Sequence, residues 1–236
     1  METDTAQDLC ILYSDKDLIA VDKPAGLLVH ASALDAHERR NAVDLLRRQT
    51  GETVVPVHRL DKGTSGVLLF ARHAAAARLW GMAFEAGHVR KRYLALVRGW
   101  PAPQGVIDHP LARDPERPSA GQARLPAITA YERIATFEWP FQVGATHASS
   151  RYALVTARPQ QGRRHQIRRH FKHIAHPIVG DATHGKGAHN RAVAQWLGTA
   201  RLWLHAEALE LDGADQRIAI TAPPGPEWSR LLLSRG

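Results

Sequence analysis

Cysteine is almost absent from this chain, which has 236 residues and a single cysteine, Cys10. One cysteine excludes an intrachain disulfide and a zinc site built from cysteines. Long apolar runs are missing too, since no stretch approaches the roughly 20 residues that a transmembrane helix needs. Glu2, Asp4 and Asp8 leave no apolar core at the N-terminus, so we expect no signal peptide. The sequence therefore predicts a cytoplasmic protein with no membrane partner.

The glycine patterns of nucleotide-binding proteins are also missing. The chain has neither a Walker A motif nor the glycine fingerprint of dinucleotide-binding folds. Ser65 lies in the run Gly63-Thr64-Ser65-Gly66-Val67, where Val67 replaces the last glycine of the Gly-x-Ser-x-Gly motif of serine hydrolases. The sequence therefore disfavours nucleotide-driven chemistry and hydride transfer, and we expect no nucleotide cofactor.

Acidic residues are too few to balance the basic ones. The chain has 31 Lys and Arg against 23 Asp and Glu, a formal net charge of +8, and its 14 His could add charge beside a polyanion. Such an excess is typical of proteins that bind nucleic acid, although a basic surface that serves only solubility gives the same total. The apolar (44%) and charged (23%) fractions are those of a folded globular protein.

Hydrophobic periodicity and turn residues predict more strands than helices. The strands are expected over residues 10–14, 18–22, 54–57, 66–72, 89–97, 128–137, 151–157, 202–211 and 217–221, and the helices over 41–49, 73–86, 162–175 and 226–233. Residues 101–127 are rich in proline and glycine and are expected to be an irregular connection. Many strands are neighbours in sequence, which favours an α+β fold with a mostly antiparallel mixed sheet and flanking helices. We expect one domain over residues 1–236.

The densest group of polar residues is His58-Arg59-Leu60-Asp61-Lys62, between two predicted strands. Loops at strand ends are held by a rigid sheet and often carry function. Arg59 and Lys62 should keep the Asp61 carboxylate ionised at neutral pH, and an ionised, positioned carboxylate can act as a nucleophile or a base. An aspartate beside two basic residues is more often a surface ion pair, so this motif alone leaves both interpretations open.

The predicted helix over residues 162–175 has a basic face. Ile167, Phe171 and Ile174 form a narrow apolar stripe that can face the core. The opposite side is basic and carries His165, Arg168, Arg169, Lys172 and His173. Because no acidic residue interrupts this helix, the pattern favours a polyanion-binding surface over a merely solvated one.

Two other features of this part of the chain allow a functional and a structural interpretation. Tyr93 lies among basic residues in the predicted strand 89–97 and could stack on a nucleobase, although a strand tyrosine packed in the core is the simpler interpretation. The histidines near residues 165–176 could suggest a metal site, but His170, His173 and His176 do not share one helix face. Neighbouring Arg and Lys would also repel a dication. We therefore expect no metal.

In their order and spacing these segments resemble the RluA-type pseudouridine synthase family along almost the whole chain. The matching motifs are Val21-Asp22-Lys23-Pro24-Ala25-Gly26; His58-Arg59-Leu60-Asp61 with Thr64-Ser65-Gly66; Lys91-Arg92-Tyr93; Gly162-Arg163-x-His165-Gln166-Ile167-Arg168-x-His170 with His176-Pro177-Ile178-x-Gly180-Asp181; and Leu204-His205-Ala206. Within the family, the chain resembles the bacterial enzymes that modify uridine 65 of tRNA. We expect too little chain before His58 for the N-terminal RNA-binding S4 domain of some ribosomal-RNA relatives.

This resemblance implies a pseudouridine synthase fold and an isomerase that converts a uridine of tRNA to pseudouridine without a cofactor. It implies that Asp61 is the catalytic residue and that Arg168 pairs with its carboxylate. By the same resemblance, Tyr93 stacks on the target uracil, Leu204 forms an apolar wall and Arg59 fills the space that the flipped base leaves. Whether Asp61 attacks the ribose or the base, or first removes a proton, stays open.

The partners implied are tRNA and no second copy of the chain, so we expect a monomer. RNA contacts are expected from six basic residues, namely Lys62, Lys91, Arg92, Arg163, Arg164 and Lys172. A ribosomal-RNA synthase of the same family is the first alternative. A non-catalytic RNA-binding module on the same scaffold is the second, although such a module would have no need of Asp61.

Overall fold

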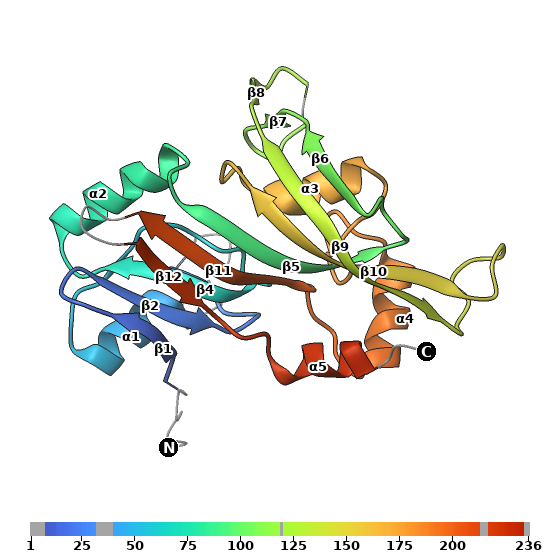
Figure 1. Cartoon of the computed structure of the whole chain (residues 1–236), viewed down its shortest axis with the longest axis horizontal. Helices are drawn as coiled ribbons and strands as arrows, with labels where there is room; N and C mark the ends of the chain where they lie inside the picture. The colour runs from blue at the N-terminus through green and yellow to red at the C-terminus, as the bar shows by residue number, and fades with distance from the viewer. Residues whose placement is uncertain (1–7, 32–39, 119, 213–216, 234–236) are drawn as a thin grey trace. The chain divides into compact units, whose positions relative to one another are not determined.

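A computed structural model describes residues 8–31, 40–118, 120–212 and 217–233 (Figure 1). The chain divides into two compact units. Unit 1 contains residues 1–89 and 208–222, and unit 2 contains residues 90–207 and 223–236. The expectation of a single catalytic domain over residues 1–236 stays a prediction. No helix of the described residues is long and apolar enough to span a membrane.

Unit 1 is an antiparallel sheet with two helices. Its elements are β1 (Cys10–Ser14), β2 (Leu18–Lys23), α1 (Ala42–Thr50), β3 (Val55–Pro56), β4 (Ser65–Ala71), α2 (Ala74–Glu85), residues 208–212 of β11 (Leu204–Asp212), and β12 (Arg217–Thr221). Strand β2 pairs with β1 and β4, β3 pairs with β4, and β12 pairs with β11, each antiparallel. The prediction that residues 66–72 form a covered central strand is confirmed, because every residue of β4 is buried.

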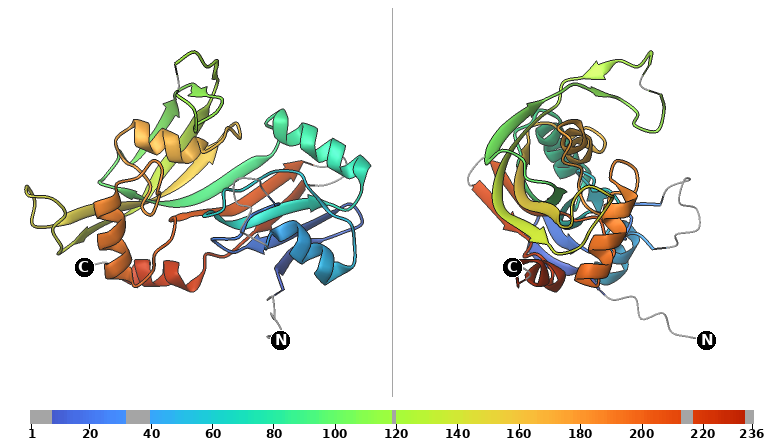
Figure 2. Two further views of the ribbon diagram at one scale, coloured as in Figure 1. Left: turned by 180° about the vertical axis from the view of Figure 1, so that it is seen from behind. Right: turned by 90° about the vertical axis from the view of Figure 1, so that its right-hand side faces the viewer.

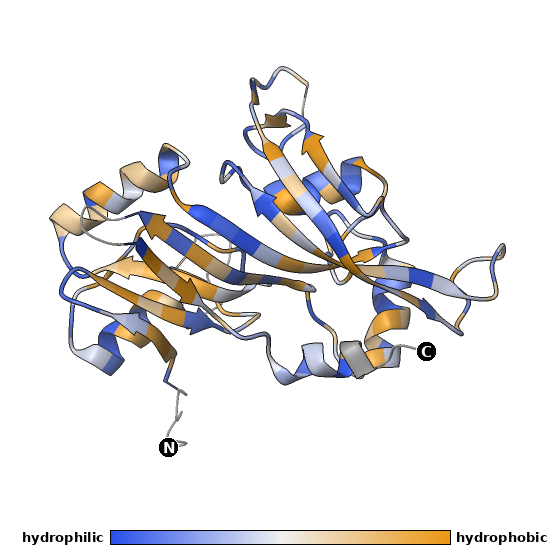
Figure 3. Ribbon diagram, viewed as in Figure 1, coloured by the Kyte–Doolittle hydropathy of each residue, from blue (hydrophilic) through white to orange (hydrophobic). Residues whose placement is uncertain are grey.

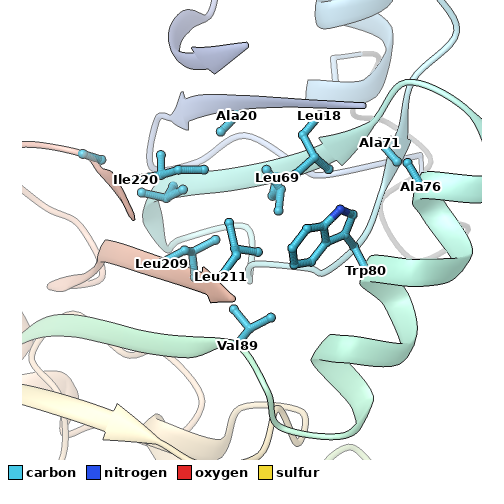
Figure 4. Close-up of a cluster of buried hydrophobic side chains, with 12 residues drawn as sticks. Leu18, Ala20, Leu69, Ala71, Ala76, Trp80, Val89, Leu209, Leu211 and Ile220 are labelled. Carbon is cyan, nitrogen blue, oxygen red and sulfur yellow. The ribbon is translucent and has the colours of Figure 1, made fainter. Parts of the chain in front are cut away.

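The core of unit 1 lies between this sheet and α2. Figure 4 shows the indole of Trp80 projecting from α2 toward Leu69 and Leu211. Helix α1 begins within one residue of its predicted start, and Asn41 is its N-cap, because the Asn41 side chain accepts a hydrogen bond from the Asp44 N–H at 3.0 Å. It ends at Gly51, whose φ of +72° is a left-handed conformation that glycine adopts without strain.

Unit 2 is built on a four-stranded antiparallel sheet with the order β5-β10-β9-β6. Its strands are β5 (Arg90–Arg98), β6 (Gln104–Asp108), β9 (Ile128–Trp139) and β10 (Ser150–Pro159), and a separate ribbon pairs β7 (Leu111–Ala112) with β8 (Arg124–Leu125). Its helices are α3 (Gln166–His173), α4 (Gly187–Leu197) and α5 (Pro226–Leu233). Helices α4 and α5 contact each other and lie side by side in both views of Figure 2.

Residues 94–97 of β5 are buried on both faces of the unit 2 sheet, and their side chains point alternately to opposite sides. Leu94 and Leu96 of β5 pack in one cluster with residues of α4 and α5. Ala95 and Val97 pack in a second cluster, which includes Phe171 of α3. Figure 3 shows blue and orange bands along α3, as expected of an amphipathic helix that packs on a sheet. The predicted basic face is only partly exposed, because Lys172 and His173 face solvent whereas Arg168 is buried.

Three details of unit 2 differ from the sequence predictions. Residues 101–127 are not wholly irregular, because β6, β7 and β8 lie among their prolines and glycines. Helix α3 begins at Gln166 rather than 162, since His165 has a left-handed φ of 56° that ends the preceding turn. Helix α4 was not predicted. Only Val193 and Leu197 of α4 are buried, a stripe too short to stand out in the sequence.

Candidate active site

Asp61 lies in the turn that leads into β4, the buried strand of unit 1. The Thr64 N–H donates to the Asp61 carbonyl at 3.0 Å and closes the turn. Thr64 and Ser65 are buried where the strand begins, whereas Asp61 stays partly exposed. The loop therefore presents a carboxylate at the end of a rigid strand, as its position in the sequence predicted.

A buried lysine anchors the residue that follows Asp61. The Lys23 side chain is 0% exposed, and its ammonium donates to the carbonyls of Pro24 (2.8 Å), Leu27 (2.8 Å) and Lys62 (3.1 Å). The Lys62 carbonyl also accepts the Gly26 N–H at 2.8 Å. Three N–H donors thus meet three carbonyl oxygens. The Lys-Pro-Ala-Gly segment holds the Asp61 loop, a role that sequence reasoning missed although it noted the motif.

His58 fixes the other side of the same loop. Its Nε2 accepts the Leu69 N–H of β4 at 3.0 Å, and its ring stacks on Phe84 of α2 with centroids 4.6 Å apart. The hydrogen bond and the ring stack together hold His58, and with it the start of the Asp61 loop, against β4 and α2. Arg59, between the two anchored residues, is exposed and makes no hydrogen bond or ion pair within the described residues.

In unit 2, Arg168 forms a buried, two-point ion pair with Asp181. The Arg168 Nε lies 2.7 Å from Asp181 Oδ2, and its Nη2 lies 2.8 Å from Oδ1. Oδ1 also accepts the N–H groups of Thr183 and His184. Burial raises the pKa of Asp181 and is the largest single influence. The Arg168 hydrogen bonds and charge, with the His184 N–H, outweigh it and hold that pKa below its usual value.

The position of Asp181 depends on the glycine before it. Gly180 has a φ of +78°, and a Cβ there would lie 1.6 Å from the Arg201 carbonyl oxygen. Only glycine allows this approach of two backbone segments. The pair Gly180-Asp181 was visible in the sequence as part of a motif, but nothing in the sequence indicated that Asp181 binds Arg168, 13 residues away.

Tyr93 and Leu204 belong to the same hydrophobic cluster as the apolar stripe of α3. Leu204 is 4% exposed, and the half-buried Tyr93 packs against this cluster, which also contains Ile167 and Phe171. Because Arg168 follows Ile167 directly in α3, unit 2 presents an aromatic ring, an apolar wall and a fixed guanidinium from one packed core.

Comparison with known proteins agrees with this arrangement. The sequence profile of the family described as RNA pseudouridylate synthase matches residues 17–173, a stretch that includes Asp61, Tyr93 and Arg168. The chain belongs to the RNA pseudouridylate synthase family. It is therefore an RNA isomerase, as the motifs predicted.

Two curated relatives of this pseudouridine synthase match it along nearly their whole length. The tRNA pseudouridine synthase C of Haemophilus ducreyi is 44% identical over 235 residues, 97% of this chain and 96% of the relative. That of Yersinia pestis is 40% identical over 233 residues, 96% of this chain and 90% of the relative. The solved structure of human RNA Pseudouridylate Synthase Domain Containing 1 superposes with a TM-score of 0.73 at 25% identity, covering 95% of this chain and 86% of that one. The predicted fold is confirmed.

The basic residues expected to contact RNA differ in their surroundings. Lys91 does not project into solvent as expected, because it is buried, its ammonium donates toward the carbonyl of Gln161 at 3.3 Å, and burial lowers its pKa to about 8. Most of the others interact within the protein: Arg92 pairs with Glu207, Arg164 pairs with Glu116 and Asp114, and Arg163 donates to the Pro126 carbonyl. Lys172 is exposed on α3, and Lys62 is half-buried in the Asp61 loop.

The four histidines of the pseudouridine synthase that suggested a metal each have a different role. His165 Nδ1 lies 3.0 Å from His184 Nε2, and His176 Nδ1 donates to the Arg98 carbonyl at 2.8 Å. His170 bridges Thr129 and the His109 carbonyl, and His173 stacks on His109. Within the described ranges, no three His, Cys, Asp or Glu side chains are grouped as metal ligands.

Proposed function

We propose that this pseudouridine synthase acts on tRNA, that its target is uridine 65, and that Asp61 is its catalytic residue. Relatives that match nearly the whole chain at 40–44% identity carry the name tRNA pseudouridine synthase C, which supports tRNA as the substrate. The structural observation that supports Asp61 most directly is its loop, which a fully buried lysine and a histidine anchor on either side.

The chemistry of the reaction explains why one positioned carboxylate can catalyse it without a co-reactant. The bond between N1 of uracil and C1′ of ribose breaks, the uracil rotates, and a bond forms between its C5 and C1′. The proton leaves C5 and N1 gains one, so no atom is gained or lost and no oxidant or reductant is needed. Asp61 could attack C1′, attack the base or remove a proton first. Each route uses an ionised carboxylate beside a base that is held in place.

In this proposal, residues of unit 2 keep the catalytic carboxylate ionised and hold the target base in place. Asp181 orients the Arg168 guanidinium through Nε and Nη2. In the proposal, this oriented guanidinium is the group that pairs with the Asp61 carboxylate, because a planar guanidinium suits a carboxylate better than an ammonium does. Tyr93 stacks on the target uracil against the apolar wall of Leu204.

The target uridine must leave its stack, which costs a few kcal/mol. Arg59, exposed on the Asp61 loop, fills the vacated space. The enzyme works as a monomer in the cytoplasm and uses no nucleotide cofactor.

The first experiment replaces Asp61 with asparagine. Asp61→Asn removes the negative charge without changing the shape. We therefore expect product formation on a tRNA transcript to fall at least about 1000-fold, within the roughly 10²–10⁴-fold that a positioned acid or base typically contributes. Affinity for the tRNA should stay within about twofold. Glu85→Gln, the same chemical change at an exposed site of α2, is the control and should keep full activity. Substantial pseudouridine from Asp61→Asn would refute the catalytic assignment.

The second experiment identifies the target. Pseudouridine is mapped across total RNA from cells with and without this enzyme, and a tRNA transcript with uridine 65 replaced by cytidine is tested in parallel. Loss of one modification at tRNA position 65 supports the proposal. Loss in ribosomal RNA would favour the ribosomal-RNA synthase, and no loss at any position would favour the RNA-binding module.

A further inference from the structure

A basic hollow opens in unit 2 beside α3. Its volume is about 470 Å³, and it is lined by residues 109–112 and 115, residue 124 of β8, residues 169, 172 and 173 of α3, and residues 183–184. Arg124, Arg169 and Lys172 line it together with three histidines. None of its lining residues is acidic.

The three cations of this hollow have no acidic partner among the described residues, unlike their neighbours. Arg164 pairs with Glu116, and Arg168 pairs with Asp181. Arg124 and Lys172 are exposed, whereas Arg169 is partly buried. Their mutual repulsion is a cost that an anion in the hollow would relieve, because like charges in a partly desolvated site destabilise one another.

Hydrogen bonds and a ring stack hold several of the lining side chains in place. Arg169 Nη1 donates to the Ala112 carbonyl at 2.9 Å, which fixes the guanidinium against the β7–β8 ribbon. Burial and the charge of Arg124 lower the pKa of Arg169, so its positive charge is not compensated within the protein. His109 and His173 stack with ring centroids 3.7 Å apart, and His170 holds the His109 carbonyl at 3.1 Å.

We propose that this hollow binds a backbone phosphate of the substrate RNA through Arg124, Arg169 and Lys172. The inference rests on the proposed function in two respects: the tested RNA is a tRNA, and Arg168 belongs to the catalytic site. A phosphate oxygen can accept from a guanidinium fork and an ammonium together, which suits this set of donors. Arg169 follows Arg168 and Lys172 lies one helical turn on, about 6 Å along the axis. The bound phosphate therefore belongs to a nucleotide near the target.

The test compares two double variants. Arg124→Gln with Lys172→Gln removes two exposed charges that have no partner to lose, so the fold and the melting temperature should be kept. We expect the tRNA Kd at 0.1 M salt to rise at least tenfold and the slope of log Kd against log salt to fall by about 1 to 2. Arg124→Lys with Lys172→Arg keeps the charges and should restore most of the affinity.

The control is Arg158→Gln, which removes an exposed arginine of β10 that pairs loosely with Glu132 at 3.8 Å. It should leave the Kd and the salt slope of the wild type unchanged. The proposal fails if the double glutamine variant binds tRNA as this control does. It also fails if inorganic phosphate occupies the hollow in the wild type while the double variant keeps its RNA affinity, since the hollow would then be a site for free anions.

Failure of the phosphate-site proposal can be distinguished from failure of the proposed function. If the wild type modifies ribosomal RNA and not tRNA, the target proposal fails, and the same binding comparison is made on the RNA that it does modify. Asp61→Asn serves as a second reference, because it should lose product and keep the full salt slope.

Discussion

Arg168 and Arg169 follow each other in α3, and the structure places their charges in opposite surroundings. Successive helix residues are turned by about 100°, so one guanidinium enters the interior and meets Asp181 while the other faces the basic hollow. A buried guanidinium that a carboxylate holds at two points has a fixed orientation and can position other groups of a site. A fixed cation without an acid partner can bind an incoming anion.

The two units show a second contrast, in how each holds a buried cation. Unit 1 surrounds the compact ammonium of Lys23 with three backbone carbonyls, whereas unit 2 matches the planar fork of Arg168 to a carboxylate. The carbonyls stabilise a turn and the loop attached to it. The ion pair instead requires two full charges to leave water together, and removing one partner leaves the other uncompensated.

The largest effect should come from breaking the ion pair of unit 2. Asp181→Asn removes the charge that compensates Arg168, and we expect the free energy of unfolding to fall by about 3 to 5 kcal/mol in a denaturant titration. Glu132→Gln removes an exposed acid that lies 3.8 Å from Arg158 and should cost less than about 1 kcal/mol. If the free energy of unfolding falls equally in the two variants, the buried ion pair of Arg168 contributes no more to stability than the exposed pair of Arg158.

A somewhat smaller effect is expected from the lysine of unit 1. Lys23→Met keeps the length of the side chain but leaves the carbonyls of Pro24 and Leu27 without this donor, so we expect a loss of about 2 to 3 kcal/mol. Because the Lys62 carbonyl also loses one of its donors, kcat should fall about tenfold or more at a temperature where the variant is folded, with KM nearly unchanged. A variant with reduced stability and wild-type kcat would contradict the role of Lys23 in positioning the Asp61 loop.

The smallest effect concerns acid and the histidine next to the ion pair. Burial and the charges of Arg168, His165 and Lys172 lower the pKa of His184 to about 4, although Asp181 opposes them. As pH falls below about 6.5, the unfolded chain binds a proton at this histidine before the folded chain does. Stability that is present at pH 7 is therefore lost, by about 2 kcal/mol at pH 5.

When the free energy of unfolding is measured from pH 7 to pH 5, it should fall by about 2 kcal/mol less in the His184→Asn variant than in the wild type. His88→Asn, which removes an exposed histidine of unit 1, should decline as the wild type does. A His184→Asn curve that runs parallel to the wild-type curve would show that His184 does not carry this dependence.

Some of the site could be read from local sequence. The run His58 to Lys62 was placed before a strand because an uninterrupted apolar stretch, residues 67–71, follows the short turn after it, and that stretch belongs to β4. Lys91 shows the opposite case. Alternation in its strand did not reveal that the ammonium is covered by residues 160 and 161, which are about 70 positions away in sequence.

The sequence by itself determined the order of most strands and helices, the motifs of the family and the excess of positive charge, since each of these depends on neighbouring residues or on counting. Only the tertiary structure decided which charges are neutralised. Arg168 forms an ion pair with Asp181, and Arg164 forms one with Glu116. The basic hollow instead contains Arg124, Arg169 and Lys172 and no acidic lining residue. Electrostatic energy depends on distance and burial, and the fold sets both by bringing together residues that lie far apart in the chain.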